Sequence, residues 1–425
     1  MDQLRELIVG RPRIVYRVRD EDVPVLSVRD GGGSSAGETS SKKWRSALKV
    51  TGLKTWVVQP SRGKVCVFLK VETDAGIHGW GEAYALTGRE HALERLVRDL
   101  GAYLIDRDPF AIKHFTHTIW RDVSIKRGGF DFYCAVSGLE IALWDVVGKA
   151  LKAPVYNLLG GPCRGPIRIY GQPSGEGSLA DRARNTVERG YRALKFDPFP
   201  GPWQAIVERE VEDTAAERVR TVREAVGPNV EILIEVHRRL APMHAVRVAQ
   251  AIEQYKPMWF EEPTPAENLE ATAYVRRKIN IPVVAGEALY TKHDFRNCFE
   301  KGAADIINPD VCNVGGILEL KEVGAMAEAY TVAVAPHGNN STTVGLAASL
   351  HAAAVMPNFL IMEYPMSWEE TANQIARNPL KVVDGHIALT DEPGLGIELD
   401  EAALERFPYR GGRERKLPSP ADEHP

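Results

Sequence analysis

The sequence predicts an α/β protein in which a parallel (β/α) barrel follows a smaller α+β domain. Between residues 166 and 378, short apolar runs alternate with amphipathic stretches at near-regular spacing, and each run ends in a polar residue. Such runs are typical of buried parallel strands, and the amphipathic stretches are typical of the helices that connect them. Before residue 166, strand-like segments come first and helical segments follow, which is the order expected of an α+β domain.

The composition is that of an ordinary globular protein. Of its 425 residues, 44% are hydrophobic and 26% are charged, and the formal net charge is −4. These values give no reason to expect a nucleic-acid or membrane partner, and no apolar run is long enough to cross a bilayer. The five cysteines are scattered and include no CxxC pair, which favours reduced thiols. We therefore expect a cytoplasmic enzyme with a small-molecule substrate.

Residues 1–46 are expected to form a flexible N-terminal extension. Charged residues alternate there with short apolar pieces, and residues 30–41 have the Gly- and Ser-rich composition of a linker. A misassigned start of translation and a functional arm both fit this pattern. We expect no catalytic role for the segment.

Residues 47–165 are expected to form the α+β domain. Apolar and polar residues alternate over 64–72, residues 73–77 indicate a turn, and an extended strand follows at 79–84. Helical periodicity then appears in three stretches, at 88–104, 109–120 and 132–151.

Residues 166–378 are expected to form the barrel. The eight strand candidates end near Gly171, Asp197, Glu235, Glu261, Glu287, Asp310, His337 and Glu363. Because the active site of a (β/α) barrel lies at the carboxyl ends of its strands, these polar residues are candidates for function. An open doubly wound sheet is the rival, but it would gather its site at one switch point. Residues 379–410 are expected to return to the first domain, with 411–425 as a tail.

Three glutamates, Glu235, Glu261 and Glu287, each close an apolar run and lie 26 residues apart. Right-handed crossovers place successive parallel strands side by side, so the three carboxylates should converge and repel one another. A hard divalent cation removes that repulsion, and an all-oxygen ligand set favours Mg²⁺. A lone strand-end carboxylate would more often be solvated or cap a helix. The adjacent Glu262 should face the barrel wall or begin a loop, because side chains alternate along a strand.

Two histidines are candidates for proton transfer. Asp310 and His337 should end neighbouring strands, so that the carboxylate bonds one imidazole nitrogen and aims the other into the cavity as a general base. A buried histidine satisfied by a local carbonyl is the alternative. His237, two residues beyond Glu235, should point the same way along the strand and is a candidate general acid. Its alternatives are a loop histidine or an outer partner of a metal ligand.

Three further charged residues are candidates for substrate contact. Lys195 is a candidate to hold a substrate carboxylate, or to act as a base if its pKa is depressed, and a structural ion pair is the alternative. Asp197, on the same face of the second strand, is a second substrate-binding candidate. Glu363 is a candidate to hydrogen-bond the bound carboxylate if it is protonated, or to pair with a lysine.

Several motifs follow one another in a specific order over about residues 48–407. One comprises residues 138–149, followed by Pro154 and by Leu-Leu-Gly-Gly at 158–161. Five others are Trp-Phe-Glu-Glu-Pro, Ala-Gly-Glu, Asn-Pro-Asp, Gly-Gly-Ile and Ala-Pro-His, which begin at residues 259, 285, 308, 315 and 335. Each is weak alone, but together they resemble the enolase superfamily, in its mandelate racemase–muconate lactonizing branch.

The resemblance implies an α+β capping domain over a modified (β/α)₇β, TIM-like barrel, an essential Mg²⁺, and removal of the proton α to a carboxylate. Members of this superfamily are known to pair a lysine or histidine base with Mg²⁺. The resemblance also implies a homo-oligomer. Loops near 84–89 and 126–133 would close over the substrate.

Within the branch, the chain looks most like the acid-sugar dehydratases of the D-galactonate dehydratase type, which share the histidine after the first ligand and the Asp–His pair. In that scheme His337 removes the C2 proton and His237 protonates the departing C3 hydroxyl, giving a 2-keto-3-deoxy acid. Lys195 matches the first lysine of the branch's Lys-x-Lys motif and would touch the substrate carboxylate.

Two positions depart from the pattern. Glu235 stands where the first ligand is usually Asp, and Asp197 replaces the second lysine of Lys-x-Lys. The missing lysine disfavours two-base racemisation, so a sugar-acid cycloisomerase or an epimerase using Lys195 and His337 is the alternative function. A Schiff-base aldolase using Lys195 would leave the three glutamates without a purpose. A barrel that binds metal and sugar acid without turnover is the non-enzyme alternative.

Overall fold

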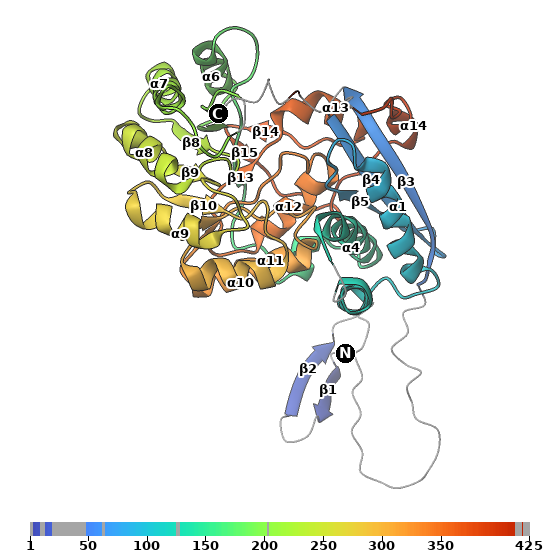
Figure 1. Cartoon of the computed structure of the whole chain (residues 1–425). Coiled ribbons are helices and arrows are strands. Elements are labelled where there is room, and N and C mark those ends of the chain that lie inside the picture. The colour runs from blue at the N-terminus through green and yellow to red at the C-terminus, as the bar shows by residue number, and fades with distance from the viewer. Residues whose placement is uncertain are drawn as a thin grey trace. The chain divides into compact units, whose positions relative to one another are not determined.

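The computed structural model describes residues 3–8, 13–18, 48–61, 64–124, 128–201, 204–412 and 419. The chain divides into two units, Met1–Arg45 and Ser46–Pro425. In the first unit, β1 (Gln3–Ile8) and β2 (Arg13–Val18) form an antiparallel hairpin that the sequence did not predict (Figure 1). The linker expected at 30–41 lies outside the described residues, as do positions 413–418 and 420–425 of the expected tail.

The second unit begins with the capping domain. Its three-stranded antiparallel sheet has the order β3 (Val50–Ser61), β4 (Lys64–Thr73), β5 (His78–Ala83). The helices that follow are α1 (Glu90–Gly101), α2 (Ile112–Ile119) and α4 (Phe130–Ala150), with α1 and α4 against the sheet in Figure 1. Gly79 and Gly81 let α4 approach β5 closely, because a Cβ at either position would lie about 2 Å from a backbone oxygen of α4.

The barrel follows as seven strand–helix units and a last strand. The strands are β6 (Ile167–Tyr170), β7 (Ala193–Phe196), β8 (Glu231–Glu235), β9 (Trp259–Glu261), β10 (Val283–Ala285), β11 (Ile306–Ile307), β12 (Ala333–Val334) and β13 (Met362–Glu363). The helices are α6 (Leu179–Glu188), α7 (Arg209–Val226), α8 (Pro242–Ile252), α9 (Leu269–Lys278), α10 (Thr291–Lys301), α11 (Ile317–Ala329) and α12 (Val344–Ala354).

The barrel is closed. Strands β7 to β12 pair in parallel in chain order, and β13 pairs in parallel with β6. Two parallel bridges, Gly171 with Leu194 and Val334 with Phe359, join the two sets. The predicted modified (β/α)₇β barrel with an α+β capping domain is therefore confirmed. Its interior is filled by side chains from successive strands: Tyr170, Ala193, Leu233, Trp259, Val284, Ile306, Ala335 and Ile361.

The segment after the barrel contacts both parts of the second unit. The hairpin of β14 (Val382–Val383) and β15 (His386–Ile387) adds to the start of β6, and the chain beyond it reaches the capping domain where Phe407 O accepts from Gln59 N–H. The remaining elements are α5 (Val155–Leu158), α13 (Glu369–Ile375), α14 (Glu401–Leu404), the 3-10 turns at Ala102–Leu104, Glu253–Tyr255 and Met366–Trp368, and a π-helical turn at Trp120–Ser124.

Two buried carboxylates fix the capping domain to the barrel. Glu82 of β5 accepts hydrogen bonds from the backbone N–H groups of Thr342, Thr343 and Gly345 at the start of α12. Glu140 of α4 accepts from the first two N–H groups of α11, at 2.7 and 3.0 Å. Helix N-termini favour a negative charge, although burial still raises the pKa of Glu140 to about 7. The sequence reasoning missed both residues, and both lie beside the loops that leave β11 and β12.

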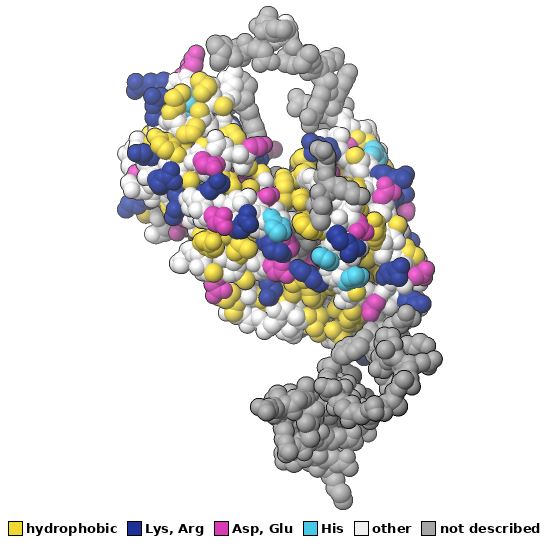
Figure 2. Space-filling view, turned by 60° about the horizontal axis from the view of Figure 1, so that its bottom comes forward, with side chains coloured by type: hydrophobic (Ala, Val, Ile, Leu, Met, Phe, Trp, Pro, Cys, Tyr) yellow, Lys and Arg dark blue, Asp and Glu magenta, His cyan; other side chains and the backbone are white. Residues whose placement is uncertain are grey.

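Among the described residues, every helix is too short or too polar to cross a lipid bilayer. On the face drawn in Figure 2, basic and acidic side chains are interspersed with apolar ones and do not form one basic patch.

Candidate active site

The predicted site residues lie at the carboxyl ends of the barrel strands. Lys195 is the third residue of β7, Glu235 closes β8, Glu261 closes β9 and Glu363 closes β13. The other predicted residues stand just beyond the last residues of β7, β8, β10, β11 and β12: Asp197, His237, Glu287, Asp310 and His337. Parallel pairing therefore brings residues from seven strands to one end of the barrel.

The three glutamates converge. One carboxylate oxygen from each of Glu235, Glu261 and Glu287 lies within 4.8 Å of the others. Glu261 is fully buried, and burial together with the charge of Glu235 raises its pKa. The buried Oε2 of Glu235 makes no hydrogen bond within the described part of the chain, although the Lys195 ammonium lies near it. Because converging like charges and an all-oxygen donor set occur together, the site fits a hard divalent cation such as Mg²⁺.

Lys195 lies among these carboxylates. Its Nζ is 2.6 Å from Glu261 Oε1, 3.2 Å from Glu235 Oε2 and 3.4 Å from Glu363 Oε2. Burial alone would lower the pKa of Lys195, but Glu261 and Glu363 outweigh it and hold that pKa well above its usual range. A charged ammonium is a poor nucleophile, so the geometry gives a Schiff-base aldolase no support.

Glu363 is placed between Lys195 and the Asp310–His337 pair. It accepts hydrogen bonds from Gln172 Nε2 at 2.9 Å and from Gly338 N–H at 3.2 Å. Burial would raise the pKa of Glu363, but the charges of Lys195 and His337 lower it overall. The position of its Oε2 beside Lys195 Nζ fits the second of the two predicted roles, pairing with a lysine.

Asp310 and His337 form a buried pair. The two residues are joined by a parallel bridge, and His337 Nδ1 lies 2.8 Å from Asp310 Oδ2. The other ring nitrogen, Nε2, lies 3.0 Å from Glu287 Oε2 and faces the carboxylate cluster. Burial opposes protonation, but Glu287 and Glu363 outweigh it and hold the pKa of His337 well above its usual range.

His237 reaches the site by a different route from the one that the sequence predicted. Strand alternation does not apply, because β8 ends at Glu235 and both His237 and Arg238 have left-handed backbone conformations, with φ of 56° and 61°. The His237 N–H donates to Glu235 Oε1 at 2.7 Å, and the His237 ring Nδ1 lies 3.0 Å from Asp197 Oδ2. Burial opposes protonation, but Glu235 and Asp197 raise the pKa of His237 overall.

Two arginines that the sequence reasoning missed complete the arrangement. Arg238 pairs with Glu287 and lies 3.7 Å from Glu262 Oε2, and Arg239 pairs with Asp197. The buried Glu262 accepts from Gly286 N–H at 2.6 Å, so it ties β9 to β10. The sequence feature that could have pointed to them is that two arginines directly follow His237.

Aromatic side chains connect the capping domain to this end of the barrel. The ring of Tyr84, in the loop after β5, lies 6.2 Å from His337 and 5.7 Å from Phe130. Phe130 and Tyr133, at the start of α4, each lie 5.7 Å from the ring of Tyr290. Of the two loops expected to close over the substrate, 84–89 is described, whereas positions 126 and 127 of the second loop, 126–133, lie outside the described residues.

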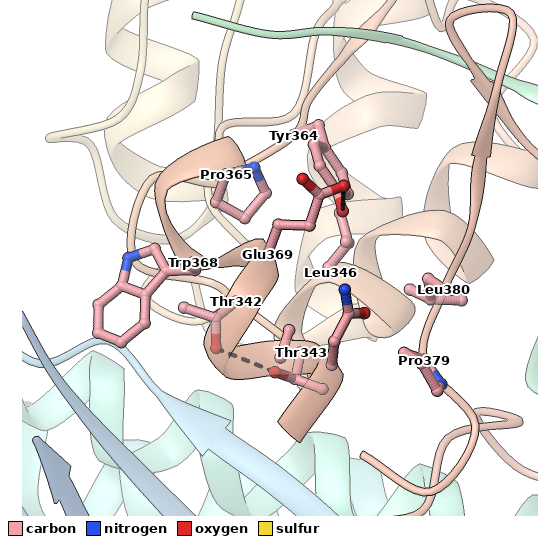
Figure 3. Close-up of a pocket in the computed structure, with 11 residues that line it drawn as sticks. Thr342, Thr343, Leu346, Tyr364, Pro365, Trp368, Glu369, Pro379 and Leu380 are labelled. Carbon is pink, nitrogen blue, oxygen red and sulfur yellow. Dashed lines mark hydrogen bonds between the residues drawn. The ribbon is translucent and has the colours of Figure 1, made fainter. Parts of the chain in front are cut away.

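A separate small pocket lies between α12 and residues 364–380 (Figure 3). Its lining includes Thr342, Trp368 and Glu369, and the Glu369 carboxylate there accepts a hydrogen bond from Tyr364 at 3.1 Å. None of the predicted site residues lines it, so it is distinct from the carboxylate cluster.

Comparison with known families agrees with the fold and with the motifs. Residues 178–403 match the family described as enolase C-terminal domain-like. Residues 54–160 match the mandelate racemase/muconate lactonizing enzyme N-terminal domain. The first match covers the barrel from α6 onward together with the segment after it, and the second covers most of the capping domain.

Curated relatives and solved structures give the same result. A D-galactonate dehydratase family member of Streptomyces bingchenggensis is 35% identical, with 83% of this chain and 92% of the relative covered. A D-galactonate dehydratase of Xanthomonas euvesicatoria is 35% identical over 84% of this chain and 94% of its own length. The crystal structure of a mandelate racemase/muconate lactonizing enzyme-like protein from Roseovarius has a TM-score of 0.80 at 35% identity, covering 87% of this chain and 99% of that one. This chain therefore belongs to the enolase superfamily, near its D-galactonate dehydratases, and is an enzyme of the hydro-lyase class.

Proposed function

We propose that this enzyme is a Mg²⁺-dependent dehydratase of a sugar acid, an aldonate or aldarate. It would remove the proton α to the carboxylate, eliminate the β-hydroxyl and release a 2-keto-3-deoxy acid. The observation that carries the proposal is the convergence of Glu235, Glu261 and Glu287 beside the Asp310–His337 pair. The similarity to D-galactonate dehydratases supports the same reaction class.

The three glutamates would hold the metal ion, and their oxygens match its preference for hard ligands. When bound, a divalent cation supplies positive charge beside the oxygens on which negative charge develops. Lys195, buried and charged next to the cluster, would hold the substrate carboxylate and add to that stabilisation.

His337 would act as the base. Asp310 binds its Nδ1, so Nε2 faces the carboxylate cluster. A cation held by Glu287 would offset the negative charge that raises the pKa of His337, and Nε2 would then be free to accept a proton. The C2 proton passes to Nε2, and the C–H electron pair becomes part of an enediolate. His237 would act as the acid. It protonates the C3 hydroxyl, the C3–O electron pair leaves with water, and the enediolate electrons form the C2=C3 bond of an enol, which tautomerises to the keto acid.

A library of aldonates and aldarates, incubated with the enzyme and Mg²⁺, tests the proposal. We expect at least one sugar acid to give a 2-keto acid, detected by semicarbazide absorbance, together with loss of 18 mass units in mass spectrometry, since one water leaves. A product of unchanged mass would support the cycloisomerase or epimerase alternative. Tight binding of a sugar acid without any product would support a non-catalytic binding protein.

A further inference from the structure

We propose that Asp197, backed by Arg239, is a positioning residue that holds His237 for protonation of the departing hydroxyl. The inference rests on the proposed dehydratase function and goes beyond it, because it changes the expected role of Asp197 from a substrate contact to a partner of the acid.

The oxygens of Asp197 are engaged by protein groups. Oδ2 lies 3.0 Å from His237 Nδ1 and also accepts from Arg239 Nη2. Oδ1 accepts from the backbone N–H of Phe199 at 2.9 Å. A carboxylate bound in this way has little capacity left for substrate hydroxyls, and it would repel an anionic sugar acid.

Arg239 is built into the wall behind this aspartate. Its side chain is 3% exposed, its Nε donates to Val236 O at 3.0 Å, and its guanidinium lies 5.3 Å from the ring centroid of Phe199. A buried arginine that is fixed on two sides leaves the Asp197 carboxylate few alternative positions.

The backbone of His237 is fixed as well. Its N–H donates to Glu235 Oε1 at 2.7 Å, and two successive left-handed residues turn the chain back toward β7. The turn is what brings the ring of His237 to Asp197, which lies 40 residues earlier in the chain. The imidazole is therefore held at both its backbone and its Nδ1.

The pairing defines which proton moves. Because Nδ1 is held by Asp197, Nε2 is the ring nitrogen that would deliver a proton to the substrate. After transfer to the C3 hydroxyl, water departs with the C3–O electron pair, and a neutral His237 that still carries Nδ1–H remains. Because the side chain of His237 is 33% exposed, solvent can restore the Nε2 proton. The site then contains two Asp–His pairs, one for the base and one for the acid.

The test separates the two half-reactions. C2 exchange in D₂O reports on the base, and formation of the keto acid reports on both base and acid. In Asp197→Asn we expect C2 exchange to stay within about twofold of the wild type and dehydration to fall by about 10- to 100-fold. His237→Asn should show the same selective loss. The double variant should lose no more than His237→Asn alone, because Asp197 acts through His237.

A second carboxylate–imidazole pair provides the matched control. Glu212 Oε1 lies 2.6 Å from His244 Nδ1, and both side chains are largely buried between α7 and α8. Glu212→Gln should leave exchange and dehydration unchanged.

Equal losses of exchange and dehydration in Asp197→Asn would overturn the inference, since a general structural defect lowers both. Full dehydration activity in that variant would overturn it too. If Asp197→Asn does not fold, Asp197→Glu replaces it in the test. The inference is then contradicted if the double variant Asp197→Glu/His237→Asn loses as much dehydration activity as the two single losses combined, because Asp197 would then act independently of His237. A wild-type enzyme that catalyses neither reaction with any sugar acid would refute the proposed function, and this inference would fall with it.

Discussion

His351 in α12 should make the stability of the protein depend on pH. Its side chain is buried, its Nδ1 accepts from Tyr156 N–H at 3.1 Å, and its ring stacks on that of Tyr156. Burial lowers the pKa of His351 from 6.5 to about 4, although a hydrogen bond with the backbone of Leu395 works in the opposite direction. The contact joins α5, at the end of the capping domain, to the barrel.

The sign follows from the two pKa values. Above pH 6.5 the histidine is neutral in both the folded and unfolded states and has no effect on the free energy of unfolding. Between pH 6.5 and 4 only the unfolded chain takes up the proton, so stability is lost as the pH falls. The loss reaches about 3.4 kcal/mol below pH 4, and amounts to about 1.3 kcal/mol between pH 7.5 and 5.5.

The measurement compares urea unfolding of the wild type and of His351→Asn at pH 7.5 and 5.5. Asparagine keeps an oxygen acceptor near the position of Nδ1 but does not titrate. The part of the change in unfolding free energy that comes from lost packing is therefore the same at both pH values. We expect the wild type's advantage over the variant to shrink by about 1.3 kcal/mol at the lower pH. An advantage that does not change with pH would refute the assignment of His351 as a buried, neutral group.

Three further predictions concern domain docking and the site. Gly316→Ala places a Cβ 2.1 Å from Glu140 Oε2 at a φ of 97°, so urea unfolding should show that the free energy of unfolding falls by at least about 2 kcal/mol. Gly165→Ala is the control, because open space surrounds Gly165, and its free energy of unfolding should change little. Equal urea midpoints for Gly316→Ala and Gly165→Ala would contradict this expected loss of stability. His337→Asn should slow C2 exchange by at least about 100-fold with an unchanged circular dichroism spectrum, and a retained rate would remove it as the base. Glu261→Gln should weaken Mg²⁺ binding by at least about tenfold in calorimetry, and an unchanged affinity would exclude Glu261 as a ligand.

The arrangement of the barrel could be predicted because it depends on local patterns. Each buried parallel strand is a short apolar run, and the strand ends must meet at one end of a closed barrel. The convergence of Glu235, Glu261 and Glu287 and the pairing of Asp310 with His337 follow from that rule alone.

The features that the sequence reasoning missed depend on contacts between distant segments. Glu82 and Glu140 look like ordinary charged residues, because the helix N-termini that they cap lie about 180 to 260 residues further along the chain. Likewise, the left-handed turn at His237 has no sequence signature, since non-glycine residues seldom adopt it. Without that turn, the pairing of Arg239 with Asp197 could not be inferred.

The central claim is that a divalent cation held by the three glutamates makes the α-proton of a sugar acid removable by His337. The most direct test is the rate of C2 exchange, followed by proton NMR in D₂O, before and after exhaustive chelation and after Mg²⁺ is restored. We predict exchange with at least one sugar acid, its loss on chelation and its recovery with Mg²⁺. Exchange that continues undiminished in the chelated enzyme would contradict the claim.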